Sequence, residues 1–172
     1  MLRVLFVSLV CTACMAPIGT FPPSNPAPPP APSLSRAEMA RNLLVEANRA
    51  RQAQGLRALV ADTSLNKAAM AYAAELARRR TLSHESNTAG RETLTKRIEV
   101  QGVRWQRAGE NLASMSGLST IVARQSIDMW LNSSGHRANL LNPQFTHGGS
   151  GVAADQYGVW YTVQIYVLPA TR

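Results

Sequence analysis

A stretch near the C-terminus places the strongest constraint on the fold. Over residues 159–167, valine, isoleucine and tyrosine alternate with tryptophan, threonine, glutamine and a second tyrosine. Strict alternation over this length predicts a β-strand. Because bulky side chains stand on both faces of the strand, we expect the sheet that contains it to be covered on both sides.

Helices precede this strand. Ser35 and Glu38 form the pattern of a capping box at the start of a helix that ends before Gly55, and Asp62 is placed to cap a second helix. Both helices carry apolar residues at helical spacing. Two further helices are predicted over residues 93–100 and 118–131, and two further strands over residues 108–115 and 148–154. These elements, joined by short turns, predict an α+β fold, a three-layer α-β-α sandwich.

The N-terminus has the pattern of an export signal. In residues 1–14, one arginine precedes an apolar run that is too short to span a bilayer. Thr12 and Ala13 precede Cys14, which resembles the bacterial lipobox, in which the cysteine is lipidated and becomes the new N-terminus. We predict lipidation of Cys14 and an outer-membrane anchor. Ordinary signal cleavage, which would leave a periplasmic or extracellular protein, is the alternative.

A proline-rich segment follows the signal. Eight of the ten prolines lie within residues 15–34. Because proline removes a backbone donor and fixes φ, this segment is predicted to be an extended, semi-rigid linker. The folded domain then covers residues 35–172, and it contains no cysteine.

The net charge of +8, from 18 basic and 10 acidic residues, favours anionic surroundings such as lipid head groups or cell-wall polymers. The simpler interpretation is a solvated basic helix face. No nucleic-acid motif or interleaved aromatic residue accompanies the arginines, so nucleic acid is excluded as a partner. The helical arginines are Arg36, Arg41, Arg49, Arg51, Arg78, Arg79 and Arg80.

The tryptophans differ in their neighbours. Trp130 and Trp160 lie within apolar elements and are predicted to be core residues. Trp105 has arginines on both sides and is predicted to be an exposed contact residue.

Three polar segments carry the candidate chemistry. His136 follows a Ser-Ser-Gly bend within residues 130–143, His84 lies in a polar loop after the second helix, and Glu110 stands between a glycine and an asparagine. Two imidazoles and a carboxylate are the groups most suited to metal binding or proton transfer. They are far apart in the sequence, so only the fold can bring them together.

These residues occur in an order that resembles the CAP superfamily of cysteine-rich secretory proteins, venom antigens and plant pathogenesis-related proteins, and its cysteine-free bacterial SCP-domain branch most closely. The similarity covers about residues 40–168. The motifs that carry it are Asn48-x-x-Arg51, His84, Gly109-Glu110-Asn111, Trp130-x-x-Ser133, Gly135-His136-Arg137-x-Asn139, Asn142-Pro143, Gly149-x-Gly151 and Trp160-Tyr161-x-x-Gln164.

The resemblance implies an α-β-α sandwich with a central cleft lined by His84, Glu110 and His136. We also assign Asn111, Ser133 and Gln164 to this cleft. Animal and plant members carry a second cleft glutamate where this chain has Ser133, which favours binding over catalysis. The resemblance also implies a lipid or a cell-wall fragment as ligand, and the sequence makes no prediction of the oligomeric state.

The chemistry of the cleft has several interpretations. His84 and His136 are suited to hold zinc or another divalent metal, with Glu110 as base or as a partner of a ligand histidine. Alternatively, the three residues form a hydrogen-bonded network that needs no cofactor. Ser133 stands three residues before His136, which permits a nucleophile–base pair, although a helix N-cap is the simpler role. We therefore predict a binding domain; a metal-dependent envelope hydrolase and a structural envelope protein are the alternatives.

Overall fold

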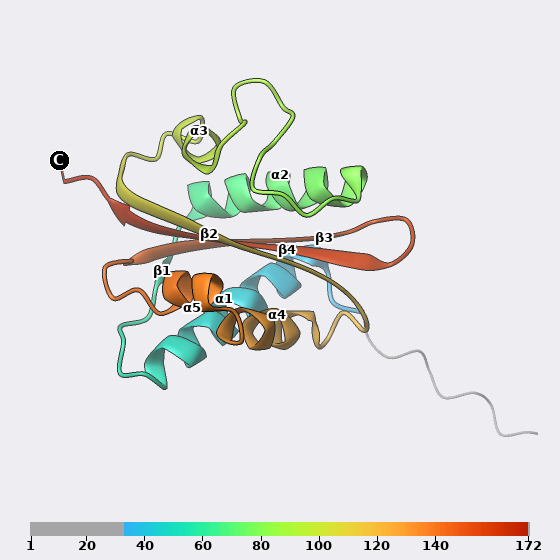
Figure 1. Cartoon of the computed structure of the whole chain (residues 1–172), viewed down its shortest axis with the longest axis horizontal. Coiled ribbons are helices and arrows are strands. Elements are labelled where there is room, and N and C mark those ends of the chain that lie inside the picture. The colour runs from blue at the N-terminus through green and yellow to red at the C-terminus, as the bar shows by residue number, and fades with distance from the viewer. Residues whose placement is uncertain (1–32, 172) are drawn as a thin grey trace, which may run out of the picture. The chain divides into compact units, whose positions relative to one another are not determined.

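A four-stranded sheet separates two layers of helices (Figure 1). The computed structural model describes residues 33–171. The strand order is β1 (Val60–Ala61), β3 (His147–Ala154), β4 (Val159–Pro169) and β2 (Trp105–Ser116). β1 pairs with β3 in parallel, whereas β3 and β2 both pair with β4 antiparallel. The predicted three-layer sandwich is confirmed.

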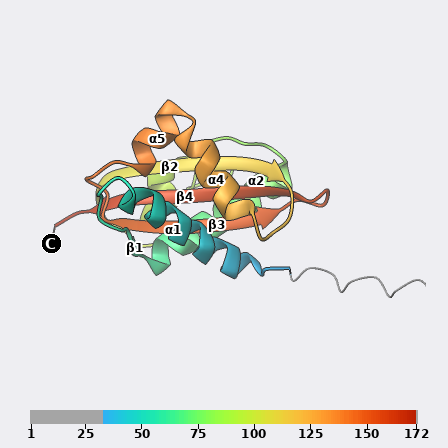
Figure 2. The same cartoon turned by 90° about the horizontal axis from the view of Figure 1, so that it is seen from below.

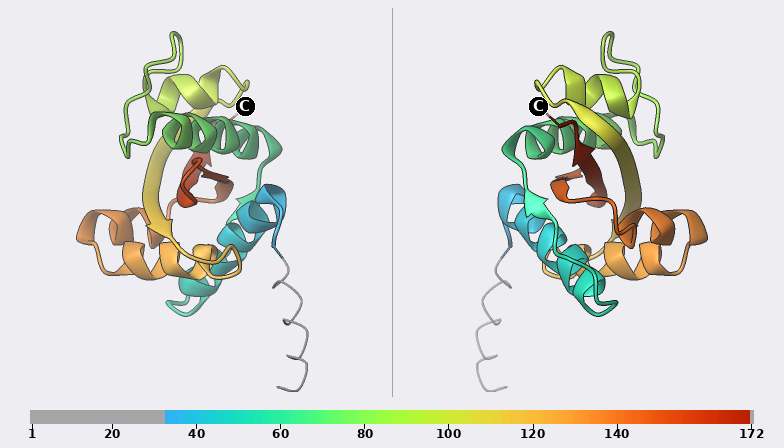
Figure 3. Two further views of the ribbon diagram at one scale, coloured as in Figure 1. Left: turned by 90° about the vertical axis from the view of Figure 1, so that its right-hand side faces the viewer. Right: turned by 90° about the vertical axis from the view of Figure 1, so that its left-hand side faces the viewer.

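Each face of the sheet has its own helices. α2 (Thr63–Arg79) and α3 (Leu94–Glu99) cover one face, and α1 (Arg36–Gln52), α4 (Val122–Leu131) and α5 (Ser134–Leu140) cover the other. Figure 2 shows the second group crossing the strands, and the end-on views of Figure 3 show the sheet between the two layers. Each interface encloses a separate apolar cluster, so burial on both faces contributes to stability.

β4 is the central strand that the alternating sequence predicts. Val163 and Ile165 are fully buried in the cluster beneath α2, while Tyr166 is fully buried in the cluster on the opposite face. The Tyr166 ring stacks on Phe145, with ring centroids 5.6 Å apart. Both faces of the strand are therefore covered, as its side chains predict.

The predicted helix starts are also confirmed. The Ser35 side chain and the Glu38 carboxylate form the reciprocal capping box of α1. Asp62 accepts a hydrogen bond from the main-chain N–H of Leu65 at 2.9 Å and so caps α2. Thr93 caps α3 in the same way, through the main-chain N–H of Lys96.

One predicted helix start is wrong, and one helix was not predicted. α4 begins at Val122 and not at Leu118, because Gly117 has a φ of +148° and a turn from Leu118 to Ile121 precedes the helix. α5 was not among the predicted helices; it starts at Ser134, with Ser133 as its N-cap residue.

The predicted environments of two tryptophans need correction. Trp105 is half-buried against the apolar cluster beneath α2, and its indole N–H donates to Glu99, so it is not a free contact residue. Trp160 is only half-buried, and its indole N–H donates to the main-chain oxygen of Gly117. Trp130 is fully buried, as predicted.

The prediction that the helical arginines form a solvated face is wrong for Arg51. Its side chain is fully buried and donates hydrogen bonds to the main-chain oxygens of Arg57, Leu140, Asn142 and Phe145. Arg51 therefore fixes α1 to the segment between α5 and β3, where its charge is offset by carbonyl dipoles.

Two glycines bring β3 against α2. A Cβ atom on Gly149 would overlap the main chain of α2 at Leu65, and one on Gly151 would overlap the main chain at Ala69. Neither position requires a positive φ. Glycine is needed here because the strand backbone touches the helix backbone.

The predicted signal in residues 1–14, with Cys14, and almost all of the predicted linker in residues 15–34 lie outside the described residues. Within residues 33–171, no helix combines the length and the apolar character that crossing a membrane requires.

Candidate functional site

The candidate site lies at the edge strand β2, where neighbouring residues serve opposite faces of the sheet. Glu110 contacts Arg97 of α3 on the α2 side. Asn111 donates a hydrogen bond to the main-chain oxygen of His136 in α5, on the other side. The two helical layers are thus both connected to this edge at adjacent positions.

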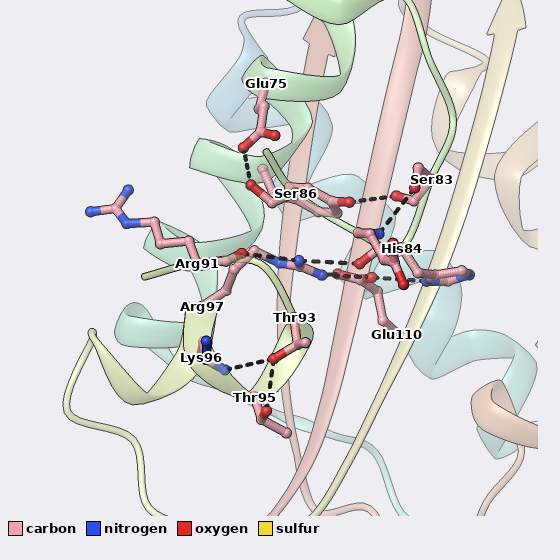
Figure 4. Close-up of polar contacts among 12 residues, drawn as sticks. Glu75, Ser83, His84, Ser86, Arg91, Thr93, Thr95, Lys96, Arg97 and Glu110 are labelled. Atoms are coloured by element: carbon pink, nitrogen blue, oxygen red, sulfur yellow. Dashed lines mark hydrogen bonds and ion pairs between the residues drawn. The ribbon is translucent and has the colours of Figure 1, made fainter. Parts of the chain in front are cut away.

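Glu110 is the centre of a buried ionic cluster. Both of its carboxylate oxygens accept hydrogen bonds from Arg97 Nη2, at 2.9 and 2.8 Å. His84 Nδ1 lies 2.9 Å from Glu110 Oε1, so the carboxylate joins the guanidinium to the imidazole (Figure 4). The side chains of Arg97 and Glu110 are 3% and 2% exposed, whereas that of His84 is 58% exposed. Only the histidine of this cluster is available to solvent.

Arg97 orders the loop that carries His84. Its guanidinium stacks on the Tyr72 ring, 3.6 Å from the ring centroid, and it donates to the main-chain oxygen of His84. The Tyr72 hydroxyl donates to the main-chain oxygen of Ser83. Burial raises the pKa of Tyr72 to about 12, so the hydroxyl remains a donor at neutral pH.

A second buried carboxylate holds the same loop farther along. Glu75 accepts hydrogen bonds from the hydroxyls of Ser86 and Thr88 and from the main-chain N–H of Asn87, and Arg79 pairs with it at 3.0 Å. Burial raises the pKa of Glu75, but these hydrogen bonds outweigh it and leave the pKa below its ordinary value. Charged Glu75 therefore anchors the loop at neutral pH.

His136 approaches the same edge from the opposite layer. Asn139 donates to the main-chain oxygen of Glu110 and to Asn111 Oδ1, which ties α5 to β2. Burial, and to a smaller extent the charge of His84, lowers the pKa of the half-buried His136 imidazole. The two histidines are thus close enough to influence each other, and His136 is neutral at physiological pH.

The remaining predicted cleft residues have different positions. Asn111 is fully buried, and its side-chain amide donates a hydrogen bond to the main-chain oxygen of His136. Ser133 is the N-cap residue of α5, but its hydroxyl makes no capping hydrogen bond, and no hydrogen bond in residues 33–171 joins it to His136. Gln164 is fully buried, accepts from the Ser150 hydroxyl and donates to the main-chain oxygen of Gly149. The structure does not bring Gln164 to the histidines.

The side chains of the candidate site offer few ligands for a metal ion. Across residues 33–171, no three His, Cys, Asp or Glu side chains come together as a metal-binding group. Because Arg97 and His84 engage the Glu110 oxygens, this carboxylate suits the role of orienting a ligand histidine better than that of a ligand. The Nδ1 contact leaves Nε2 of His84 free. A metal would therefore be held by His84 and His136 alone.

Arg97 and Glu75 were not predicted from the sequence. A single arginine within a six-residue helix gives no indication that it is buried, and its partner Glu110 lies 13 residues away on a different element. The only local indication is the adjacent apolar Ile98, which is also buried.

Replacement of His136 by glutamine is expected to reduce the loss of stability in mild acid. As the pH falls, His136 of the unfolded chain is protonated near its usual pKa of about 6.5, whereas His136 of the folded chain is protonated only at lower pH. The contribution of neutral His136 to the free energy of unfolding is therefore fully present above about pH 6.5. It is lost as the pH falls towards the lower folded-state pKa. Urea denaturation midpoints of both proteins at neutral and mildly acidic pH test this. If the variant loses as much stability in mild acid as the wild-type chain, the prediction is wrong.

Comparisons with known proteins agree with this fold. Residues 44–166 match the pattern of the cysteine-rich secretory protein family, CAP. The uncharacterized protein YkwD of Bacillus subtilis strain 168 is 38% identical over 104 residues, which are 60% of this chain and 38% of YkwD. The uncharacterized membrane protein YlbC of the same organism is 32% identical over 117 residues, 68% of this chain and 32% of YlbC. The chain thus spans well under half the length of these relatives.

Solved structures show the same architecture. An extracellular protein containing a SCP domain from Bacillus anthracis strain Ames has a TM-score of 0.62 and 31% identity, over 77% of this chain and 41% of that one. An outer surface protein from Borrelia burgdorferi has a TM-score of 0.67 and 24% identity, over 80% of this chain and 97% of that one. The second similarity concerns the fold alone.

Proposed function

Since the chain belongs to the cysteine-rich secretory protein (CAP) family, we propose that it is an exported binding domain of the bacterial cell envelope, in which His84 and His136 bind a divalent metal ion such as zinc. The observation that carries this proposal is the contact of 2.9 Å between His84 Nδ1 and Glu110 Oε1. A carboxylate on one ring nitrogen orients a histidine and increases the basicity of the other nitrogen, which is the usual arrangement of a metal-ligating histidine.

Two further features support metal binding. The His84 side chain is 58% exposed, so its second nitrogen is accessible from solvent. The lowered pKa of His136 keeps its imidazole neutral, which is the form that binds metals. With only two protein ligands, a bound ion would retain positions for water or for an anionic group of an envelope ligand, such as a lipid or a cell-wall fragment.

The same contacts favour binding over catalysis. A hydrolase would use Glu110 as a general base, but Arg97 engages both of its oxygens and His84 shares one of them. A carboxylate that is buried and paired in this way has little capacity to take a proton from water. Export is supported by the similarity to a Bacillus anthracis SCP-domain protein described as extracellular, and the lipid anchor at Cys14 remains a prediction.

Zinc titration of the full chain by calorimetry at neutral pH is expected to show saturable binding that disappears in the His84→Ala, His136→Ala double variant. Glu110→Gln is expected to weaken binding by about 10- to 100-fold, because the ligand histidine loses its orienting partner. His147→Ala is the matched control, because His147 lies on β3 and contacts Thr146 instead of the cluster. Equal zinc binding by the double variant and the wild-type chain would refute the proposal.

A further inference from the structure

A second polar feature lies at the end of the molecule where α2 terminates and the chain turns from β3 to β4 (Figure 1). A cavity of about 370 Å³ opens there. Residues from α1, α2 and the β3–β4 turn contribute to its wall. They include Arg36, Arg78, Arg80 and Asp155, together with the small side chains of Ala74 and Ala77. Small alanine side chains leave space for three arginines to reach one cavity.

The charges of this cavity are not balanced within the protein. Arg36, Arg78 and Arg80 form no ion pair with any residue in 33–171, in contrast to Arg79 and Arg97. Asp155 is the single acidic residue of the wall, and its Oδ1 accepts main-chain N–H groups of the turn. Three positive charges and one negative charge leave a net charge of +2 around the cavity.

Arg80 has an unusual backbone conformation. It ends α2 with a φ of +52°, and it is the only residue other than glycine in 33–171 with a positive φ. Glycine is the usual residue at this position because a Cβ atom is strained there. The Arg80 guanidinium lies 5.3 Å from the ring centroid of Tyr157, which is 68% exposed. The left-handed backbone of Arg80 and the neighbouring Tyr157 ring hold the Arg80 guanidinium at the wall of the cavity.

We propose that this cavity binds a phosphate monoester group. Guanidinium groups donate paired hydrogen bonds that match phosphate oxygens, and three of them suit a compact anion with three free oxygens. The net charge of +2 matches a dianion, which a phosphate monoester approaches at neutral pH. No hydrogen bond or ion pair in residues 33–171 connects the cavity wall to the His84–Glu110–Arg97 cluster, so this is a separate site.

Titration of the full chain with phenyl phosphate tests the proposal. Saturable binding is expected, with weaker binding of the monoanion phenyl sulfate. An Arg36→Ala, Arg78→Ala double variant is expected to bind phenyl phosphate at least about tenfold more weakly, because charge-assisted hydrogen bonds are lost. Arg124→Ala is the matched control, since Arg124 is an exposed arginine of α4 outside the cavity. An unchanged melting temperature of the double variant would show that folding is intact.

Vesicles identify the source of the phosphate. We compare sedimentation with phosphatidylcholine vesicles that contain or lack phosphatidic acid. Retention that needs phosphatidic acid and is lost in the double variant supports a lipid head group. Binding of phenyl phosphate without vesicle retention supports a soluble phosphorylated ligand, such as a sugar phosphate. The absence of phenyl phosphate binding, or an equal loss in Arg124→Ala, overturns the site. The His84→Ala, His136→Ala variant should bind phenyl phosphate normally, which separates this test from the zinc proposal.

Discussion

Replacement of Gly151 by alanine is expected to destabilise the domain by about 3 kcal/mol or more, at or above the upper end of the usual cost of overpacking. The added methyl group would overlap the carbonyl group of Ala69 in α2. A side chain could rotate away, but main-chain atoms cannot move unless the whole helix shifts. A shift of α2 would also open the apolar cluster that it forms with β4.

Chemical denaturation of the wild-type chain and of Gly151→Ala measures this effect. Gly135→Ala is the matched control, because Gly135 lies within α5 and a Cβ atom there would contact nothing within 4 Å. The control is expected to be neutral or to gain about 0.5–1 kcal/mol, since alanine is a better helix former than glycine. If both variants lose the same free energy of unfolding, the close approach of β3 to α2 is not the cause.

Replacement of Arg97 by methionine is expected to cost about 3–5 kcal/mol, because it leaves the buried charge of Glu110 without its main partner. The same change removes the cation that stacks on Tyr72 and the hydrogen bond to the main-chain oxygen of His84. The loop that carries His84 would lose its order along with the stability of the cluster.

A double variant separates charge from packing. In Arg97→Met, Glu110→Leu both charges of the buried pair are removed together, so most of the lost free energy of unfolding is expected to return. Urea denaturation of the two single variants and the double variant gives the coupling energy. If Arg97→Met costs less than about 1 kcal/mol, the pair behaves as an exposed salt bridge and the buried cluster is refuted.

Elements with strong local signals could be predicted from the sequence. The capping residues Ser35 and Asp62 start the helices as expected, and β4 is buried on both faces. These features depend on side-chain spacing and on hydrogen bonds within a few residues, so the sequence records them directly. The CAP motifs also identified the three segments that carry His84, Glu110 and His136.

Features that depend on contacts between distant segments could not be predicted. Arg51 and Arg97 were indistinguishable from surface arginines. Three of the four partners of Arg51 lie 89 to 94 residues away, and Glu110, the partner of Arg97, lies on another element. Gln164 was assigned to the cleft from its place in a motif. It lies opposite Asn111 in the β2–β4 pairing, but its side chain forms hydrogen bonds with Ser150 and Gly149 of β3 and not with cleft residues. A buried arginine and an exposed arginine look the same in the sequence, and only the folded structure shows which of them is buried.

The order of the strands has a consequence for the timing of folding. β3 and β4 lie at the centre of the sheet but occupy residues 147–169, after all five helices of the described residues. Until they have been synthesised, β1 has no partner and the helices have no sheet to cover. Domains generally fold as units, once all of their elements are available. Residues 36–140 therefore cannot complete the sandwich until residues 147–169 have left the ribosome, and a polypeptide that has not yet folded can be threaded through a membrane pore.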